Sequence, residues 1–178
     1  MTELVRETSE STVRVSVERG GGECKIDTGD RFLDHMLTTL ARYADVRFDI
    51  RASADLRHHL IEDVAITVGA AMRRLAGPTV ARYGDATVPM DDALVSAVID
   101  VGGRSYYEGP LPSSLYDHWM RSFCEHAAAT LHIRVLRGRD RHHVVEAAFK
   151  ALGFALRQAL QESGGINSTK GAARWSAD

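Results

Sequence analysis

The sequence predicts an α+β fold made by tandem duplication of one strand-strand-helix-strand-helix unit. The chain has 178 residues, which suits a single domain built from two small halves with a shared core. An Asp-His pair followed by a His-His-x-x-Glu motif occurs twice, starting at Asp34 and at Asp117. The same order of strand-like and helix-like segments surrounds both copies. We therefore expect two small sheets with helices on one face of each, and the two helix layers packed together.

The first half, residues 1–84, is expected to hold three strands and two helices. Residues 13–17 alternate apolar and polar side chains, as a half-buried strand does. Gly20-Gly21-Gly22 follows as a turn, so residues 23–27 should form the second arm of a hairpin. The remaining expected elements are a helix at 33–44, a strand at 46–54 and a helix at 62–75.

The second half, residues 85–178, repeats this order within one integrated domain. Residues 93–99 are strand-like and a Gly102-Gly103 turn follows, so residues 105–108 should form the second hairpin arm. A helix at 115–129, a strand at 130–136 and a helix at 144–161 complete it. We expect residues 77–89 to connect the halves, and the C-terminal tail from residue 164 to bind substrate.

Composition excludes several classes of protein. The formal net charge of −2 argues against nucleic-acid binding, which needs a basic surface. No apolar run approaches the ~18 residues of a membrane helix, and the N-terminal residues lack the basic and apolar regions of a signal peptide. Two cysteines, Cys24 and Cys124, do not make a disulfide framework. These features predict a cytoplasmic protein.

Six of the eight histidines belong to the repeated motif and predict metal binding. Residues three and four apart share a helix face, so Glu62 lies beside its histidine pair, and Glu146 beside the pair in the second half. Imidazole next to carboxylate is a metal-ligand set. Eight ligands would form two octahedral sites of four protein ligands each, with positions left open for substrate or water. The eight are His35, His58, His59, Glu62, His118, His142, His143 and Glu146.

Adjacent histidines in a pair must point in different directions. Each pair could therefore serve two metal ions in one chain, or one ion in each of two subunits. The absence of thiolate ligands disfavours structural zinc. Mixed imidazole and carboxylate ligands favour Mn²⁺ or Fe²⁺, whereas the general order of affinities would favour Zn²⁺.

A second set of residues predicts anion binding. Ser168, Thr169 and Lys170 combine two hydroxyls and an ammonium that could surround a phosphate. Arg82 and Arg104 adjoin glycine-containing turns between the two ligand sets. Lys150 lies one helical turn after Glu146.

These motifs resemble the imidazoleglycerol-phosphate dehydratase family of histidine biosynthesis. The resemblance implies two Mn²⁺ per active site, with Fe²⁺ or Zn²⁺ possible, held by the eight residues above. It implies substrate contacts from Glu10, Arg82, Arg104 and the Ser-Thr-Lys tail, to which we add His35 and Lys150. It further implies a homo-oligomeric cage of 24 subunits with active sites between subunits. The matching segments are residues 6–11, 28–37, 58–63, 82–84, 89–94, 102–104, 142–151 and 168–171.

The resemblance also implies a reaction. Water is removed from imidazole glycerol phosphate to give imidazole acetol phosphate, with two metal ions stabilising an imidazolate. We expect Glu146 to act as the acid/base, with Glu62 and His58 as further catalytic residues. The family pattern is changed near the site at Thr38, Thr39, Tyr43, Arg57 and Leu60.

Three alternatives stay open at this point. A dimetal hydrolase would use similar ligands on a phosphorylated substrate. A related dehydratase would act on another phosphorylated imidazole compound. A metal-storage or scaffold protein would bind metal but neither imidazole nor phosphate analogues, and would leave the Ser-Thr-Lys tail and Arg104 without a role.

Overall fold

The computed structural model describes residues 1–168 of the chain, and they form two similar halves. Each half has four strands and two helices. The elements of the first half are β1 (Thr2–Glu7), β2 (Ser11–Arg19), β3 (Lys25–Asp27), α1 (Arg31–Ala44), β4 (Val46–Ala54) and α2 (Arg57–Ala76). Those of the second half are β5 (Tyr83–Met90), β6 (Ala93–Val101), β7 (Tyr106–Glu108), α3 (Ser114–Ala127), β8 (Ala129–Arg137) and α4 (Arg141–Ala159).

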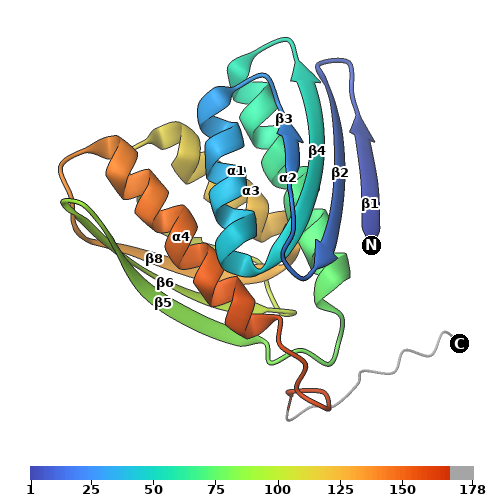
Figure 1. The fold of residues 1–178 in the computed structure, drawn as a ribbon, viewed down its shortest axis with the longest axis vertical. Helices are drawn as coiled ribbons and strands as arrows, with labels where there is room; N and C mark the ends of the chain where they lie inside the picture. The colour runs from blue at the N-terminus through green and yellow to red at the C-terminus, as the bar shows by residue number, and fades with distance from the viewer. Residues whose placement is uncertain (169–178) are drawn as a thin grey trace, which may run out of the picture.

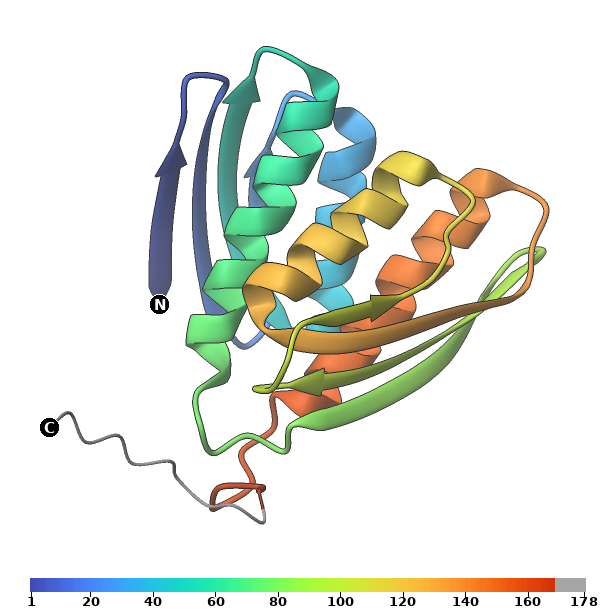
Figure 2. The same ribbon diagram turned by 180° about the vertical axis from the view of Figure 1, so that it is seen from behind.

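The molecule has four layers, with a sheet on each outside and the helices between them (Figures 1 and 2). The strand orders are β1-β2-β4-β3 and β5-β6-β8-β7, so the two sheets share one topology. Across the middle, α1 packs against α4 and α2 packs against α3. The predicted α+β duplication with packed helix layers is confirmed.

The core lies between each sheet and its helices because the strands alternate in burial. On β2, Val13, Val15 and Val17 are buried and the residues between them face outward. Val15 pairs with Ile50 of β4 and Val17 with Phe48, so one apolar face forms across the two strands. No described helix is long and apolar enough to cross a membrane.

Two glycines set how closely the helix layers approach. Gly69 of α2 and Gly153 of α4 each follow the first histidine of their motif by eleven residues. A Cβ atom on Gly69 would lie 2.5 Å from the carbonyl oxygen of Phe123 in α3. A Cβ atom on Gly153 would lie 2.6 Å from the Cβ of Tyr43 in α1. Both helix crossings therefore depend on a missing side chain at the same repeat position.

The predicted hairpins are wrong. β3 and β7 do not pair with β2 and β6; each runs parallel to the fourth strand of its half, on that strand's far side. The antiparallel partners of β2 and β6 are instead β1 and β5, two strands that the sequence analysis missed. The glycine turns thus begin a crossover to the other edge of the sheet rather than a tight hairpin.

The segment predicted to connect the halves contains β5, which begins at Tyr83. Its Gly84 and Pro89 are unfavourable in central strands, but β5 is an edge strand, where such residues are tolerated. Gly84 is required there, because a Cβ atom would clash with the backbone carbonyl of Ala155 in α4. The predicted helices and the strands at 46–54 and 130–136 are confirmed, with ends that move by up to five residues at the start of α2.

Candidate functional site

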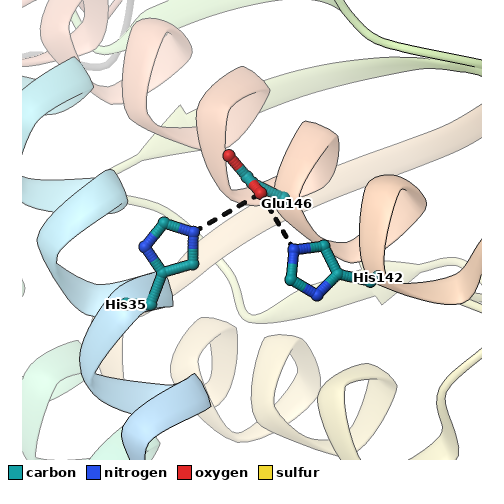
Figure 3. Close-up of side chains that lie close together, drawn as sticks. All are labelled: His35, His142 and Glu146. Carbon is teal, nitrogen blue, oxygen red and sulfur yellow. Dashed lines mark ion pairs between the residues drawn. The ribbon is translucent and has the colours of Figure 1, made fainter.

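The first ligand group joins α1 to α4 (Figure 3). His35 projects from α1, and His142 and Glu146 project from the first two turns of α4. Nε2 of His35 lies 3.4 Å from Oε2 of Glu146, and Nε2 of His142 lies 3.3 Å from the same oxygen. The three ligand atoms all lie within 4.8 Å of one another, which is a separation that a single metal ion can bridge.

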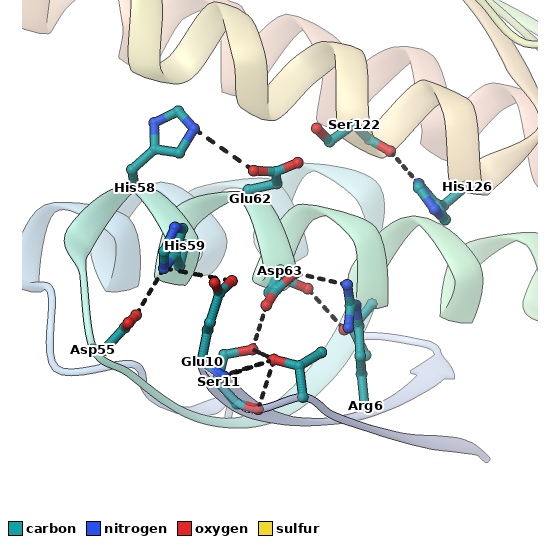
Figure 4. Close-up of polar contacts among 12 residues, drawn as sticks. Arg6, Glu10, Ser11, Asp55, His58, His59, Glu62, Asp63, Ser122 and His126 are labelled. Carbon is teal, nitrogen blue, oxygen red and sulfur yellow. Dashed lines mark hydrogen bonds and ion pairs between the residues drawn. The ribbon is translucent and has the colours of Figure 1, made fainter.

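The second ligand group joins α2 to α3 in the same way. Nε2 of His58 lies 3.6 Å from Oε2 of Glu62, and Nε2 of His118 lies 3.4 Å from it. The rings of His58 and His118 are stacked with centroids 5.1 Å apart. Figure 4 shows His58 and Glu62 side by side at the start of α2. These three ligand atoms also lie within 4.8 Å of one another.

Each group therefore takes ligands from both halves of the chain. The His-x-x-x-Glu part comes from the last helix of one half, and the remaining histidine comes from the Asp-His pair of the other. This exchange follows from the packing of α1 on α4 and of α2 on α3. Neither half has a complete group of its own.

The helix starts fix the positions of the paired histidines. α2 and α4 begin one residue before their His-His pairs, so both pairs occupy a first turn. At α4, the side chain of Asp140 caps the helix by accepting a hydrogen bond from the backbone N–H of His142 at 2.7 Å.

The second histidine of each pair points away from the groups. The rings of His58 and His59 are inclined at 76°, and those of His142 and His143 at 89°. Nδ1 of His59 lies 2.7 Å from Oδ1 of Asp55, and Nδ1 of His143 lies 2.7 Å from Oδ1 of Asp92. Six of the eight predicted ligands thus come together in this chain, and His59 and His143 do not join them.

The carboxylate partners shift the pKa values of these two histidines. The hydrogen bond to Asp55 raises the pKa of His59, and the hydrogen bond to Asp92 raises the pKa of His143. The hydrogen bond from His143, together with the backbone N–H groups of Arg139 and Asp140, lowers the pKa of Asp92 to about 2. A carboxylate on one ring nitrogen orients the imidazole and makes the other nitrogen a better metal ligand.

The donor atoms fit a divalent metal ion. Each group offers two imidazole nitrogens and one carboxylate oxygen, the ligand types of Mn²⁺, Fe²⁺ and Zn²⁺ sites. Nε2 of His118 is buried without a hydrogen-bond partner among the described residues, although it lies 3.4 Å from Glu62. A buried nitrogen normally has a partner, and a bound metal ion would supply one.

Lys150 distinguishes the group on α4. Its Nζ lies 2.9 Å from Oε1 of Glu146, the carboxylate oxygen that the histidines do not approach. Burial raises the pKa of Glu146, but the hydrogen bond and charge of Lys150, with a contribution from His35, outweigh it and hold the pKa below its usual value. Glu146 is therefore an ionised carboxylate with both oxygens in contact with partners.

A buried carboxylate attaches the first strands to α2 (Figure 4). Asp63 is 7% exposed, and Nη2 of Arg6 lies 3.0 Å from its Oδ1. The hydroxyl of Ser11 donates a hydrogen bond to its other oxygen. These contacts place Glu10, in the turn between β1 and β2, with its Oε2 3.7 Å from Nδ1 of His59.

Arg82, one of the predicted anion-binding residues, lies at the far end of α4 from the ligand group. The backbone N–H of Arg82 donates to the carbonyl oxygen of Ala159, the last residue of α4. His142 lies near the start of that helix, about 25 Å away at a helical rise of ~1.5 Å per residue. The guanidinium of Arg82 binds both carboxylate oxygens of Asp100 and also donates to the carbonyl oxygen of Asn167 at 3.3 Å.

The same end of the molecule holds the start of the predicted tail. Asn167 donates to the carbonyl oxygen of Ala81, which places Ser168 next to the Arg82 segment. The carbonyl oxygen of Arg104 accepts from Thr130 at the start of β8. Thr169 and Lys170 lie outside the described residues. Among the described residues, Arg82 is therefore remote from the ligand group at the start of α4, whereas Lys150 lies within that group.

Sequence reasoning did not identify the contacts of the acidic residues around the site. Asp55 precedes His59 by four residues, which is a spacing the sequence displays, but it lies before the predicted helix. Asp92 and Asp63 reach their partners only through tertiary packing, from the β5–β6 turn to α4 and from α2 to β2. No spacing along the chain could have indicated these two.

Together, the duplicated fold and the two histidine–glutamate groups define a candidate metal-dependent enzyme. A family model described as imidazoleglycerol-phosphate dehydratase matches residues 28–156. The chain belongs to this family, and the protein is accordingly a hydro-lyase of histidine biosynthesis.

Known proteins of the family are similar over almost the whole chain. Imidazoleglycerol-phosphate dehydratase from Kineococcus radiotolerans is 44% identical, covering 95% of this chain and 96% of its own. That from Pyrobaculum calidifontis is also 44% identical, covering 93% and 96%. The crystal structure from Pyrococcus furiosus matches with a TM-score of 0.87 at 40% identity, covering 96% of this chain and all of that one. The structure from Staphylococcus aureus matches with a TM-score of 0.79 at 29% identity, covering 90% and 98%.

Proposed function

We propose that this protein converts imidazole glycerol phosphate to imidazole acetol phosphate at dimetal sites shared between subunits of a cytoplasmic homo-oligomer. The observation that carries the proposal is the pair of histidine–glutamate groups assembled across the two halves. The family assignment supports the reaction. The metal preference is for Mn²⁺, and the ligand types also suit Fe²⁺ or Zn²⁺.

The eight predicted ligands would hold two metal ions per active site. His35, His142 and Glu146 supply three ligands of one site, and His58, Glu62 and His118 supply three of the other. His59 and His143, which point away, would each complete a site that belongs largely to another subunit. When bound, the two ions supply Lewis acidity to the ring nitrogens of the substrate and so favour the imidazolate form.

The chain's own side chains would move the protons. The hydroxyl on the carbon beside the ring leaves as water, and the next carbon loses its proton to give an enol, which becomes the ketone. We assign the acid/base role to Glu146 because the ammonium of Lys150 lies 2.9 Å from it and can exchange a proton with it. Glu62 and His58 occupy the matching place in the other group and complete the proposed catalytic set.

The anion-binding residues would hold the substrate phosphate from a neighbouring chain. The backbone of Arg82 lies about 25 Å from His142 of its own chain at ~1.5 Å of helical rise per residue, and Arg104 follows Gly103, which adjoins the Arg82 guanidinium. We therefore propose that both arginines serve an active site whose metal ligands come from another subunit. Ser168, Thr169 and Lys170 would join them, and Glu10, His35 and Lys150 would contact the substrate from the metal side. In a closed assembly of 24 subunits every active site would be complete, because each chain supplies residues to one neighbour and receives residues from another.

The experiment is a comparison of two histidine variants loaded with Mn²⁺. His142→Ala should lose turnover of imidazole glycerol phosphate and bind less metal, because it removes a ligand. His126→Ala is the matched control, since His126 contacts only the carbonyl oxygen of Ser122 among its recorded partners in residues 1–168 (Figure 4). It should keep both activity and metal. Normal turnover and two full metal equivalents per chain in His142→Ala would overturn the assignment.

A further inference from the structure

The two ligand groups are related by the repeat but differ in charge. Lys150 follows Glu146 by four residues and lies against its carboxylate, with only 15% of the Lys150 side chain exposed. The residue four after Glu62 is Ile66, which is half-buried and uncharged. The ion pairs recorded for Glu62 in residues 1–168 are with His58 and His118 alone. One group therefore has a fixed cation beside it, and the other does not.

We propose that Lys150 makes the two metal sites unequal, so that the group of His58, Glu62 and His118 holds its ion more tightly than the group of His35, His142 and Glu146. This inference rests on the proposed metal sites. With neutral imidazoles, the Glu62 group has a net charge of −1, whereas Lys150 brings the Glu146 group to zero. The net negative charge of the Glu62 group attracts a divalent ion. The Glu146 group, with Lys150 beside it, has no net charge to do so.

Distance makes the effect of the ammonium large. Nζ of Lys150 lies 2.9 Å from Oε1 of Glu146, so an ion held at the other oxygen would lie close to the ammonium. The repulsion between a unit charge and a dication at a separation of about 5 Å lowers affinity roughly tenfold even at the dielectric constant of water, and further when the pair is partly buried. Burial restricts the Lys150 side chain, whose Nζ contacts both Oε1 of Glu146 and, at 3.1 Å, Sδ of Met90.

The ammonium also restricts how the carboxylate can bind. Oε1 of Glu146 accepts from Lys150, which leaves Oε2 as the oxygen that faces His35 and His142. Glu62 has no such cation among the described residues, and its side chain is 35% exposed against 8% for Glu146. Glu62 can offer both oxygens to an ion, whereas Glu146 offers one. Charge and the number of available ligand oxygens thus both favour tighter metal binding by the group that contains Glu62.

The test is stepwise removal of metal from the assembled, Mn²⁺-loaded protein. The protein is dialysed against buffers of graded free Mn²⁺ set by a chelator, and metal per chain is measured by atomic emission. We expect two release steps separated by at least roughly tenfold in free Mn²⁺. Glu146→Gln should remove the step at higher free metal, and Glu62→Gln the step at lower free metal.

A reciprocal pair of variants isolates the ammonium. Lys150→Met keeps the length and apolar stem but removes the charge, so it should bring the two steps together. Ile66→Lys places an ammonium beside Glu62, so it should shift the tighter step towards the weaker one. Thermal melting of the metal-free proteins shows that each variant is folded, and Ile66→Lys tests the proposal independently if Lys150→Met does not fold.

The failures are distinguishable. A single release step in the natural protein, or an unchanged separation in Lys150→Met, overturns the inequality of the sites while leaving the dimetal function standing. Absence of stoichiometric metal in the natural protein overturns the proposed function itself.

Discussion

Individual side chains show how much the supporting residues matter. Six of the eight proposed ligands could be named from residue type and helical spacing, because three- and four-residue separations put side chains on one helix face. The repeated Asp-His pair added the other two, His35 and His118. The sequence could not show which histidine of each pair joins a ligand group. That depends on the ring direction, which Asp55 and Asp92 fix through contacts at 2.7 Å.

Asp92 is expected to control metal binding without being a ligand. In Asp92→Asn, the amide oxygen can still accept from the backbone at Arg139, but His143 loses its charged partner. We expect metal affinity to fall about tenfold, which is the lower end of the range for such supporting residues. Chelator competition measures the change.

Asp27→Asn is the control for this substitution, because Asp27 is an exposed acidic residue at the end of β3. It should leave metal affinity unchanged. Equal affinity in the natural protein and Asp92→Asn would show that the hydrogen bond to His143 has no role in metal binding.

At the scale of helices and strands, local patterns predicted the elements but not their partners. Alternating burial on β2 and apolar spacing on α4 are local signals, and both elements form where expected. β3 was assigned to the wrong neighbour because a turn of three glycines is compatible with a hairpin or a crossover. β1 and β5 were missed because edge strands tolerate charged residues, glycine and proline that mask the alternation.

The close helix crossings lead to a prediction about stability. Replacing glycine with alanine inside a helix normally raises the free energy of unfolding by ~1 kcal/mol. At Gly69 the added methyl group would lie 2.5 Å from a backbone oxygen of α3, which must shift to make room. We expect Gly69→Ala and Gly153→Ala each to lower the free energy of unfolding by about 1–3 kcal/mol.

Thermal and denaturant unfolding measure this effect. Gly165→Ala is the comparison, because nothing lies within 4 Å of an added Cβ there. Its stability should change by no more than about 0.5 kcal/mol. A stabilising effect of Gly69→Ala would mean that α2 and α3 can separate at no cost.

For the whole molecule, the sequence predicted the duplication and the two layers of helices, since the motif and its flanking segments repeat. It did not predict that each ligand group spans both halves. The Asp-His and His-His-x-x-Glu motifs of one half are consecutive in the sequence, yet α1 packs against α4 and α2 against α3. That choice is made by the complementary surfaces of folded helices, among them the glycine contacts at residues 69 and 153.

Separation of the ligand groups from Arg82 predicts complementation between defective chains. A His142→Ala chain lacks a metal ligand but has intact anion-binding residues, and an Arg82→Ala chain has the opposite defect. Each alone should be inactive. Mixed oligomers should recover measurable dehydratase activity, because some sites combine the intact parts of both chains.

Two different affinity tags allow the mixed oligomers to be purified and assayed. If they contain both chains and remain inactive, each active site must lie within one chain. Oligomers made from Arg104→Ala and Arg82→Ala chains serve as the control and should stay inactive, because both defects fall in the same part of the site.

Metal should also hold the subunits together. Ions bound between chains stabilise the assembled state by mass action, and imidazole ligands bind metal only when neutral. Chelator, or acidification to about pH 5, below the ordinary histidine pKa of ~6.5, should therefore produce smaller oligomers. Mn²⁺ at neutral pH should restore the large particle, as light scattering would show. An unchanged mass with and without metal would contradict metal sites between subunits.

The exchange of ligands between halves has a consequence for the origin of the chain. A single-copy ancestor, with one Asp-His and one His-His-x-x-Glu motif, could have built a ligand group only by pairing face to face with a second copy of itself. Such a twofold dimer would have carried two identical groups. A chain that carries both copies is free of that constraint, so one group can have a lysine where its counterpart has an isoleucine. The difference between Lys150 and Ile66 is one that a symmetric dimer of identical single-copy chains could not have.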